Sequence, residues 1–319
     1  MPEFPEVAVS IQAISNQILG RSIESAHVST HLDGQWWDLN YLTSGFSVYK
    51  ISQRGKYIEI HLLRSEELRR VLDIKSEERL NYKIPPKLRC ILIIHLGMSG
   101  MITTIPATSD NQPHRHINIR LGVSVTESSE DEFVDLQVYD PRKFGRIALC
   151  KRPADQKIYY KNTGPDLYMI SGVRRARYLP PVMDKSRGSK IFINRYRDIY
   201  PSGWSLKKCL LDQRAISGIG NIYASEILFA SGLLPTRELG SIPDRWLRTI
   251  YEEGIRIISD ATRLGGSSIQ SFKDPNGIRG QYQDYHSVYN RGTCDYCGSS
   301  IVSLKLDGRS TFWCPSCQR

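Results

Sequence analysis

The spacing of apolar residues changes early in the chain. From Glu3 to Leu19, apolar residues recur every three or four positions, which places them on one face of a helix, and Gly20 ends the run. The sequence therefore predicts that the protein opens with an amphipathic helix.

After this helix the pattern becomes that of short strands. The segments are rich in β-branched and aromatic residues, and Gly, Pro, Asp and Asn separate them. They cover residues 47–63, 89–95, 117–125, 133–139 and 146–150. This pattern predicts a β-sandwich or barrel-like domain. The charged stretch 64–87 interrupts the pattern and is expected to be a helical or irregular insertion with a solvated surface.

Helical patterns dominate the second half of the chain. The strand pattern stops near Thr163-Gly164-Pro165-Asp166, and a basic connecting stretch follows. The predicted helices cover residues 205–216, 221–231 and 242–263. The first two are joined by Ser217-Gly218-Ile219-Gly220, and a glycine-rich stretch after the third leads into a cysteine cluster. We therefore predict an α+β fold with two domains, an N-terminal β-sandwich with a leading helix and a C-terminal helical domain.

The net charge of the chain is +10, and it is unevenly distributed. Residues 168–319 contain 22 basic and 13 acidic side chains, a net charge of +9, which leaves +1 for residues 1–167. A basic half suits a polyanionic partner, although a mild basic excess also occurs in proteins that bind no nucleic acid. No apolar run approaches the roughly 20 residues of a membrane span, and the N-terminus lacks a signal-peptide pattern. We expect a cytoplasmic protein associated with the nucleoid.

Four of the seven cysteines form two CxxC pairs that are separated by sixteen residues. They are Cys294, Cys297, Cys314 and Cys317. This spacing is typical of a closed tetrahedral zinc site rather than of a disulfide framework. Because four thiolates leave no open coordination position for water, we predict one structural Zn²⁺ that stabilises a small hairpin.

The N-terminal sequence offers a candidate nucleophile. Removal of Met1 would expose a secondary amine at Pro2, directly before a helix whose dipole disfavours the protonated amine and lowers its pKa. A neutral amine can attack a sugar carbon or an aldehyde and form a Schiff base. Glu3 or Glu6 could protonate the departing or ring oxygen. Taken alone, this stretch is more simply explained as a helix start at which the prolines and glutamates serve only the helix.

A set of motifs resembles the formamidopyrimidine-DNA glycosylase family, in order along the chain. After MPEFPEV come QRGKY (53–57), HLGMSG (95–100), DPRKFG (140–145), the segment 210–235, and GRSTFWCPSCQ near the C-terminus. Stretches 64–88, 104–113 and 168–200 have no clear counterpart. The resemblance implies a base-excision repair enzyme that removes oxidised purines, such as 8-oxoguanine and formamidopyrimidines, through a Schiff base and β,δ-elimination.

The same resemblance implies catalytic roles. Pro2 would attack the C1′ carbon of a damaged nucleotide and expel the base, with Glu3 as proton donor and Glu6 beside it. Lys56, on the QRGKY strand, would contact phosphate and assist β-elimination. Arg309, on the hairpin turn between the cysteine pairs, would contact phosphate and support δ-elimination.

A damaged base must leave the stack before the sugar can be reached, and side chains must fill the gap. The resemblance assigns this role to Met98, Arg142 and Phe144. A thioether and an aromatic ring can wedge between bases, and Arg142 can hydrogen-bond the partner base that is left behind.

Further DNA contacts are implied in both halves of the chain. Lys207 matches a basic phosphate ligand, and Asn221 is expected to cap a helix whose N-terminus attracts phosphate and to contact DNA. His114 or His116 resembles the family's phosphate-contacting histidine.

These roles define the expected organisation. Residues 1–167 would form the catalytic domain, 168–264 a helix-two-turns-helix DNA-binding domain, and 265–319 a lesion-covering loop followed by the zinc finger. The expected partner is damaged double-stranded DNA, which a monomer would bind; no membrane is involved.

Two alternatives remain open. The endonuclease VIII branch uses the same nucleophile on oxidised pyrimidines, although HLGMSG and DPRKFG resemble the purine-excising branch. A non-catalytic DNA-binding paralogue would be favoured by loss of the catalytic residues, and Pro2, Glu3 and Lys56 are all present. In the lesion-covering loop the family commonly has a basic residue and an acid before an aromatic, whereas this chain has Ile269-Gln270-Ser271-Phe272. The preference between 8-oxoguanine and ring-opened purines therefore stays open.

Overall fold

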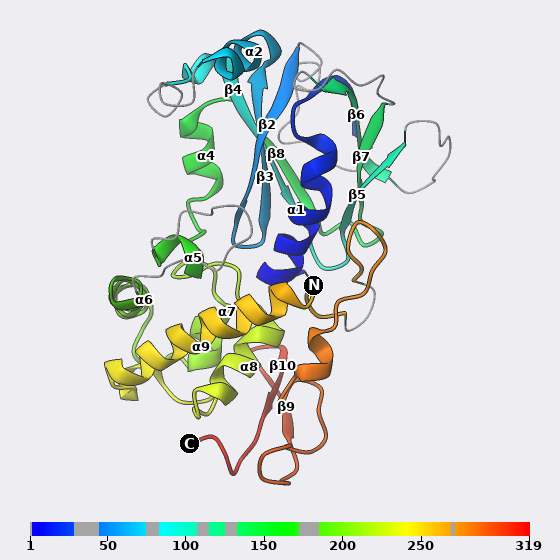
Figure 1. The fold of residues 1–319 in the computed structure, drawn as a ribbon. Helices are drawn as coiled ribbons and strands as arrows, with labels where there is room; N and C mark the ends of the chain where they lie inside the picture. The colour runs from blue at the N-terminus through cyan, green and yellow to red at the C-terminus, as the bar shows by residue number, and fades with distance from the viewer. Residues whose placement is uncertain are drawn as a thin grey trace. The chain divides into compact units, whose positions relative to one another are not determined.

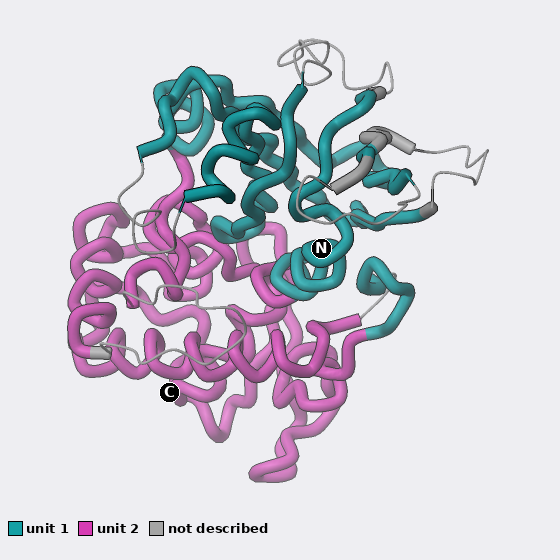
Figure 2. Tube along the Cα trace, turned by 45° about the horizontal axis from the view of Figure 1, so that its top comes forward, with its two compact units in different colours: residues 1–2, 6–161, 269–279 teal, residues 3–5, 162–268, 280–319 magenta. Residues whose placement is uncertain are grey.

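The structure, a computed structural model, describes residues 2–28, 45–74, 83–106, 115–124, 133–171, 185–268 and 272–319. The contacts divide the chain into two compact units (Figure 2). Unit 1 contains Met1–Pro2, Glu6–Lys161 and Ile269–Arg279, and unit 2 contains Glu3–Pro5, Asn162–Ser268 and Gly280–Arg319.

Unit 1 is built on an eight-stranded sheet (Figure 1). Its strands are β1 (Arg21–Val28), β2 (Phe46–Arg54), β3 (Tyr57–Arg64), β4 (Arg89–His95), β5 (Met101–Pro106), β6 (Arg115–Ser124), β7 (Val134–Tyr139) and β8 (Arg146–Cys150). All neighbours are antiparallel, in the order β5-β7-β6-β1-β2-β3-β4-β8. Strand β1 pairs along most of its length with β6 but with β2 only at Ser22↔Ser47, so it joins two halves of the sheet.

One apolar core is shared by both halves of the sheet and by the opening helix α1 (Phe4–Ile18). On β3, alternate residues Ile58, Ile60 and Leu62 face this core, as the two-residue period of a strand requires. Helix α1 contributes one face of apolar side chains at helical spacing, namely Val7, Ile14 and Ile18. Two sheet faces that enclose one core form a sandwich, as the alternation of short strands predicts.

Three short elements complete unit 1. They are α2 (Ser65–Asp73), η3 (Pro86–Leu88) and α4 (Pro153–Tyr159). The chain after α4 covers the other face of β4 and β8, where Tyr160 packs with Ile93, Ala148 and Cys150.

Unit 2 consists mainly of helices. They are α5 (Leu167–Ile170), α6 (Lys185–Ile199), α7 (Leu206–Leu211), α8 (Asn221–Ala230), η4 (Leu239–Ser241), α9 (Asp244–Arg263) and η5 (Tyr282–Tyr285). Helix α8 is buried over most of its length, and α9 packs against both α6 and α8. None of the helices in the described part of the chain is both long and apolar enough to cross a membrane.

A two-stranded hairpin ends unit 2. Strands β9 (Val302–Leu306) and β10 (Arg309–Trp313) are joined by Asp307 and Gly308, whose φ angles are 48° and 74°. Two positive φ angles are those of a type I′ turn, and Asp-Gly is a sequence that adopts it readily. The predicted fold, with an N-terminal sheet domain, a helical domain and a finger hairpin, is thus confirmed.

Candidate functional site

The carboxylate of Glu3 lies at the N-terminus of α8 and is only 1% exposed. The backbone amides of Gly220, Ile222 and Tyr223 donate hydrogen bonds to it at 2.7, 3.0 and 3.4 Å. A Cβ atom on Gly220 would lie 2.3 Å from the Glu3 carboxyl carbon, so only glycine permits this approach. A negative charge here also interacts favourably with the helix dipole, and Glu3 therefore acts as the cap of α8.

Asn221 was expected to cap α8, and this expectation is wrong. The N-cap residue is Gly220, and the capping carboxylate comes from Glu3, more than 200 positions away in the sequence. Asn221 is the first residue of the helix, and its Nδ2 donates to the carbonyl of Ser310 at 2.8 Å. Its side chain thus joins the start of α8 to the residue that follows Arg309, and its contact with DNA stays a prediction.

Lys207 lies inside unit 2 and is 1% exposed. Its ammonium donates to the Ser225 hydroxyl at 2.5 Å and to the Asn221 carbonyl at 3.2 Å, so it ties α7 to the first turns of α8. Burial lowers its pKa to about 7, although Glu3 and Glu226 nearby oppose this shift. This position indicates that Lys207 braces the helix; the phosphate contact expected from the sequence stays a prediction.

Pro2 and Glu6 lie at the start of unit 1. Pro2 is buried and precedes the first residue of α1 by two positions. Glu6 is 1% exposed and is the acidic residue of the first turn of α1. The amine that loss of Met1 would create therefore lies directly before a helix, as the sequence predicts.

Lys56 lies in a turn and not on a strand, which corrects the expected placement. Arg54, the last residue of β2, pairs with Tyr57, the first residue of β3, and Gly55 adopts a φ of 56° in the two-residue connection. The Lys56 side chain is 7% exposed. Burial and then the charge of Lys56 lower the pKa of His95, at the end of β4, to about 4. His95 is thus neutral at physiological pH, and its Nδ1 accepts a hydrogen bond from the Gly97 amide at 3.1 Å.

Asp140 fastens together the two turns formed by HLGMSG and DPRKFG. Its carboxylate is 2% exposed and accepts hydrogen bonds from the Ser99 hydroxyl at 2.9 Å and from the Gly145 amide at 2.5 Å. Gly97 has a φ of 64°, and a Cβ atom there would lie 2.5 Å from the Phe144 carbonyl carbon. Asp140 is the first residue of the DPRKFG motif, but neither its chemistry nor its spacing marks it as a functional residue in the sequence.

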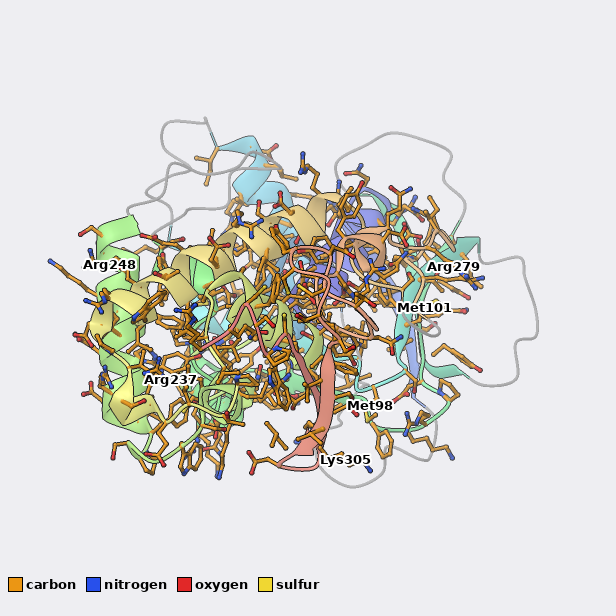
Figure 3. The ribbon with its side chains drawn as sticks, turned by 90° about the horizontal axis from the view of Figure 1, so that it is seen from below. Met98, Met101, Arg237, Arg248, Arg279 and Lys305 are labelled. Atoms are coloured by element: carbon orange, nitrogen blue, oxygen red, sulfur yellow. The ribbon has the colours of Figure 1, made fainter. Side chains whose placement is uncertain are left out.

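The predicted gap-filling residues project from these two fastened turns. Met98, labelled in Figure 3, is 40% exposed and Phe144 is 52% exposed. The guanidinium of Arg142 lies 5.1 Å from the centre of the Phe144 ring. Large apolar side chains that are exposed beside an arginine fit a surface that inserts into stacked bases.

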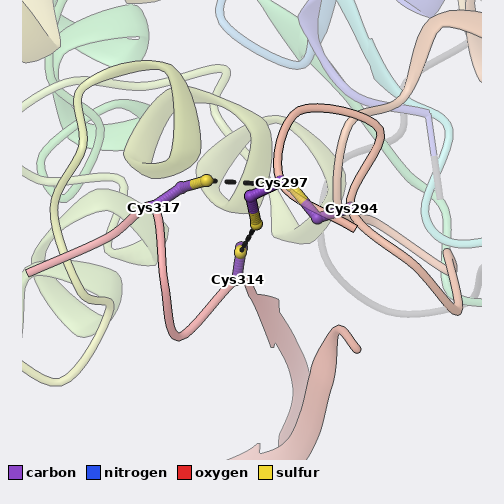
Figure 4. Close-up of side chains that lie close together, drawn as sticks. All are labelled: Cys294, Cys297, Cys314 and Cys317. Carbon is purple, nitrogen blue, oxygen red and sulfur yellow. Dashed lines mark hydrogen bonds between the residues drawn. The ribbon is translucent and has the colours of Figure 1, made fainter. Parts of the chain in front are cut away.

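The four clustered cysteines form a metal centre (Figure 4). Their sulfur atoms all lie within 4.8 Å of one another, with Cys294–Cys317 at 3.8 Å and Cys297–Cys314 at 3.4 Å. A tetrahedral site with Zn–S bonds near 2.3 Å requires sulfur separations of about 3.8 Å, so the geometry fits one structural zinc ion. The prediction of a four-cysteine zinc finger is confirmed.

Arg309 lies directly after the Asp307-Gly308 turn, as the first residue of β10, and its side chain is exposed. Lys305, also exposed, lies on the neighbouring strand (Figure 3). The structure thus brings Glu3, Lys207, Asn221 and Arg309 together in unit 2, and Lys56, Met98, Arg142 and Phe144 occur in unit 1.

Some predicted features lie outside the described residues. His114 is among them, and the backbone of His116 is described in β6 but its side chain is not. The loop sequence Ile269-Gln270-Ser271 is likewise outside.

Three family models match the chain. Residues 1–147 match the formamidopyrimidine-DNA glycosylase N-terminal domain, residues 189–273 match the formamidopyrimidine-DNA glycosylase H2TH domain, and residues 293–319 match the zinc finger found in FPG and IleRS.

Individual proteins are similar over the whole chain. The formamidopyrimidine-DNA glycosylase of Hahella chejuensis is 28% identical over 325 residues, which cover 100% of both chains. A structure of the Lactococcus lactis Fpg with DNA that contains an abasic site matches with a TM-score of 0.72 and 25% identity over 99% of each chain. MutM in complex with DNA that contains carbocyclic 8-oxo-G matches with a TM-score of 0.70 and 25% identity over 100% of each chain.

Proposed function

The chain belongs to the formamidopyrimidine-DNA glycosylase family, and on this premise we propose that it excises oxidised purines and then cleaves the DNA strand at the abasic site. Membership makes it a DNA glycosylase of base-excision repair. The substrate class and the lyase step are the proposal. Related structures that hold DNA with an abasic site or with carbocyclic 8-oxo-G support both.

The observation that carries the proposal is the fixed position of Glu3. Three backbone amides hold its carboxylate at the start of α8, and a side chain at position 220 would displace it. Because Glu3 is one peptide bond from Pro2, anchoring it also restricts where the N-terminal amine can lie. An acid held beside an amine is the pair that Schiff-base chemistry on a sugar requires.

The proposed reaction begins when the Pro2 nitrogen forms a bond to C1′ of the damaged nucleotide. The bond from C1′ to the base breaks, and the base leaves with the electron pair and takes up a proton. The Glu3 carboxylate takes up the proton that the Pro2 nitrogen releases and passes it to the ring oxygen as the sugar opens, which leaves an iminium between Pro2 and C1′. Loss of the C2′ proton then breaks the bond from C3′ to its phosphate. Loss of the C4′ proton breaks the bond from C5′ to its phosphate. Water finally hydrolyses the iminium and frees Pro2.

Cationic side chains serve the two elimination steps. In this proposal Lys56, in the β2–β3 turn, holds a phosphate next to the reacting sugar, and Arg309, exposed at the tip of the finger, contacts phosphate during the second elimination. The remaining residues have supporting roles in this proposal. Glu6 lies beside the catalytic acid, and the DNA contacts come from Lys207, Asn221 and His114 or His116.

Met98, Arg142 and Phe144 fill the gap that the everted nucleotide leaves. Their exposure on turns held together by Asp140 supports this role, because inserted side chains must be free of the core and yet positioned before DNA binds.

Reduction with borohydride tests the nucleophile. An iminium between Pro2 and C1′ is reduced to a stable amine, so incubation with an 8-oxoguanine duplex and borohydride should give a covalent protein–DNA complex. A chain with one lysine inserted between Met1 and Pro2 keeps its methionine and blocks the amine, and it should give no complex. The same extended chain should still bind the duplex, which separates loss of the nucleophile from loss of folding.

Two results would overturn the proposal. Trapping of the extended chain at the rate of the natural chain would remove Pro2 as the nucleophile. In a panel of duplexes with single lesions, excision of oxidised pyrimidines but not of 8-oxoguanine or formamidopyrimidine would favour the endonuclease VIII activity instead.

A further inference from the structure

The connection between α7 and α8 holds the N-terminal peptide through backbone groups. We call residues 217–220 of this connection the glycine turn. The Phe4 amide donates a hydrogen bond to the Gly218 carbonyl at 3.1 Å, and the Gly220 amide donates to the Glu3 carboxylate at 2.7 Å. Both contacts lie within unit 2. The position of the glycine turn therefore sets where the backbone that follows Pro2 lies.

The glycine turn needs support from outside itself. Gly218 has a φ of 104°, a conformation that favours glycine, and Gly220 has no room for a Cβ atom beside Glu3. Glycine has more accessible backbone conformations than any other residue, so a turn built on two glycines does not define its own shape. Bonds from neighbouring residues must define it.

The side chain of Gln213 supplies such bonds. Its Oε1 accepts a hydrogen bond from the Gly218 amide at 2.8 Å. Its Nε2 donates to the carbonyls of Ile219 and Leu211, each at 2.8 Å. A side-chain amide has two N–H donors and one carbonyl oxygen, and here each of them faces a partner of the opposite kind. The half-buried Gln213 thus binds two successive residues of the glycine turn.

The backbone of Gln213 is itself fixed. Its carbonyl accepts a hydrogen bond from the Gly164 amide at 2.8 Å. The same segment bonds the first residue of the glycine turn, because the Ser217 hydroxyl donates to the Gly164 carbonyl at 2.8 Å and the Ser217 amide donates to the Pro165 carbonyl at 2.9 Å. Gln213 is therefore held in place before its side chain binds the turn.

We propose that Gln213 is a positioning residue for the N-terminal nucleophile. Gln213 fixes the glycine turn, the turn fixes Glu3 and Phe4, and these two residues fix the amine of Pro2. This inference rests on the proposed function, in which Pro2 attacks C1′. Because the same amine reacts with a damaged nucleotide and with an abasic site, loss of the Gln213 amide should slow both reactions by the same factor and leave binding of the duplex unchanged.

The test replaces Gln213 with methionine, which has a similar length but no donor and only a weak acceptor. Single-turnover rates of strand cleavage are measured against enzyme concentration, on an 8-oxoguanine duplex and on an abasic-site duplex. Loss of one hydrogen bond corresponds to about fivefold, and a displacement of about 1 Å can cost about 100-fold in rate. We expect Gln213→Met to lower the saturating rate on both duplexes by about ten- to hundredfold, and to change the half-saturating concentration less than twofold.

A matched control uses the same substitution at a glutamine of unit 1. Gln156, in α4, is also half-buried, and its Nε2 donates to Glu59 at 3.3 Å. Gln156→Met should keep both saturating rates within twofold of the natural chain. If Gln213→Met lacks the melting transition of the natural chain, Gln213→Asn takes its place. It keeps an amide on a side chain that is one methylene shorter, and a loss of about fivefold is expected on both duplexes.

Three results would overturn the inference. The first is a natural saturating rate in the substituted chain. The second is a loss on one duplex only, which would point to recognition of the base and not to the amine. The third is a half-saturating concentration that rises as much as the rate falls, which would show that Gln213 only supports the folded DNA-binding surface.

Hydrogen exchange, followed residue by residue, separates this inference from the proposed function. In Gln213→Met the amides of Gly218 and Phe4 should exchange faster, because the first loses its acceptor and the second is bonded to the loosened turn, whereas the amides of α9 should keep their natural rates. If the natural chain cleaves neither duplex, the proposed function fails, and the exchange rates alone decide whether Gln213 positions the N-terminal peptide. Unchanged exchange at both amides, or equal acceleration throughout α9, would refute the positioning role.

Discussion

The substitution Asp140→Ala should separate recognition of damaged DNA from general DNA binding. Asp140 accepts one hydrogen bond from Ser99 and one from Gly145, and these bonds hold together the turns that carry Met98 and Phe144. Alanine removes both bonds and leaves the half-buried Gly145 amide without this acceptor. Asp140→Asn keeps the shape, and its single amide oxygen can still accept from one donor while its nitrogen faces the adaptable Ser99 hydroxyl.

The magnitude follows from the number and kind of bonds lost. A bond to a charged group contributes roughly 1.5–3 kcal/mol and a neutral one about 1 kcal/mol. Asp140→Ala removes two bonds to a charged group, so we expect it to lower the free energy of unfolding by about 3–6 kcal/mol, and Asp140→Asn to lower it by a smaller amount, about 1–3 kcal/mol. Where loosened turns must become ordered again on binding, part of this energy is lost from the lesion complex. A loss of about 1–2 kcal/mol is a five- to thirtyfold loss of affinity.

The assay is fluorescence anisotropy at fixed salt with two duplexes, one with an abasic-site analogue and one undamaged. Asp140→Ala should weaken binding to the first and change binding to the second less than twofold, because the side chains proposed to insert contribute only once a base has left the stack. Ser99→Ala removes a single neutral-donor bond and should fall between Asp140→Ala and the natural chain. Equal weakening on both duplexes, or natural affinity for the abasic duplex, would refute the idea that Asp140 positions the inserting turns.

The remaining predictions concern the charge, the metal and the arginines. The pKa of Lys207 is about 7 in the folded protein and ordinarily 10.5. Between these pH values the unfolded chain binds more protons than the folded chain, so stability rises with pH. The free energy of unfolding of the natural chain should therefore rise from pH 7 to pH 9 relative to Lys207→Met, by up to about 1.4 kcal/mol per pH unit. A pH-independent difference in denaturant melts would contradict this. Elemental analysis should find one zinc per chain, and freshly purified protein without zinc would exclude a structural zinc site. Cys314→Ser should unfold the finger and weaken DNA binding while the sheet of unit 1 stays folded. Arg309→Ala should weaken binding to damaged and undamaged duplex alike and reduce the salt slope by about one, whereas Arg142→Ala should impair mainly the lesion complex, by fivefold or more. Equal losses for both variants on both duplexes would count against Arg142 in the gap.

The sequence predicted elements well where a periodic pattern was long. The opening helix and most strands of unit 1 were found, because burial on one face imposes a strict period. Strands β1 and β5 were missed, since β1 begins with Arg-Ser and alternates weakly and β5 follows directly after the HLGMSG turn. Helix α6 was also missed, because its sequence is rich in charged and polar residues and was interpreted as a connection. The single segment 47–63 proved to be two strands, which Gly55 and Lys56 separate.

The candidate site was predictable as a set of side chains but not as a set of contacts. Motifs identified Pro2, Glu3 and the cysteines, whose chemistry depends on residue type and local spacing. Asp140 was not selected, because it acts by accepting hydrogen bonds from a side chain that is remote along the chain and from a backbone amide. No spacing rule reports such partners.

The capping of α8 shows why the motifs depend on one another. Glu3 and Gly220 are 217 positions apart, yet the carboxylate occupies the place that a side chain at 220 would fill. A helix N-terminus normally obtains its cap from the residue next to it, and here the local candidate, Asn221, turns toward the finger at Ser310. The N-terminal peptide, the glycine turn and the finger hairpin are therefore linked through the first turn of one helix. This linkage also explains the placement of Glu3–Pro5 in unit 2, although α1 otherwise belongs to unit 1. The residue beside the proposed nucleophile is thus positioned by the helical unit and by the cap it supplies, and not by the sheet that its own helix covers.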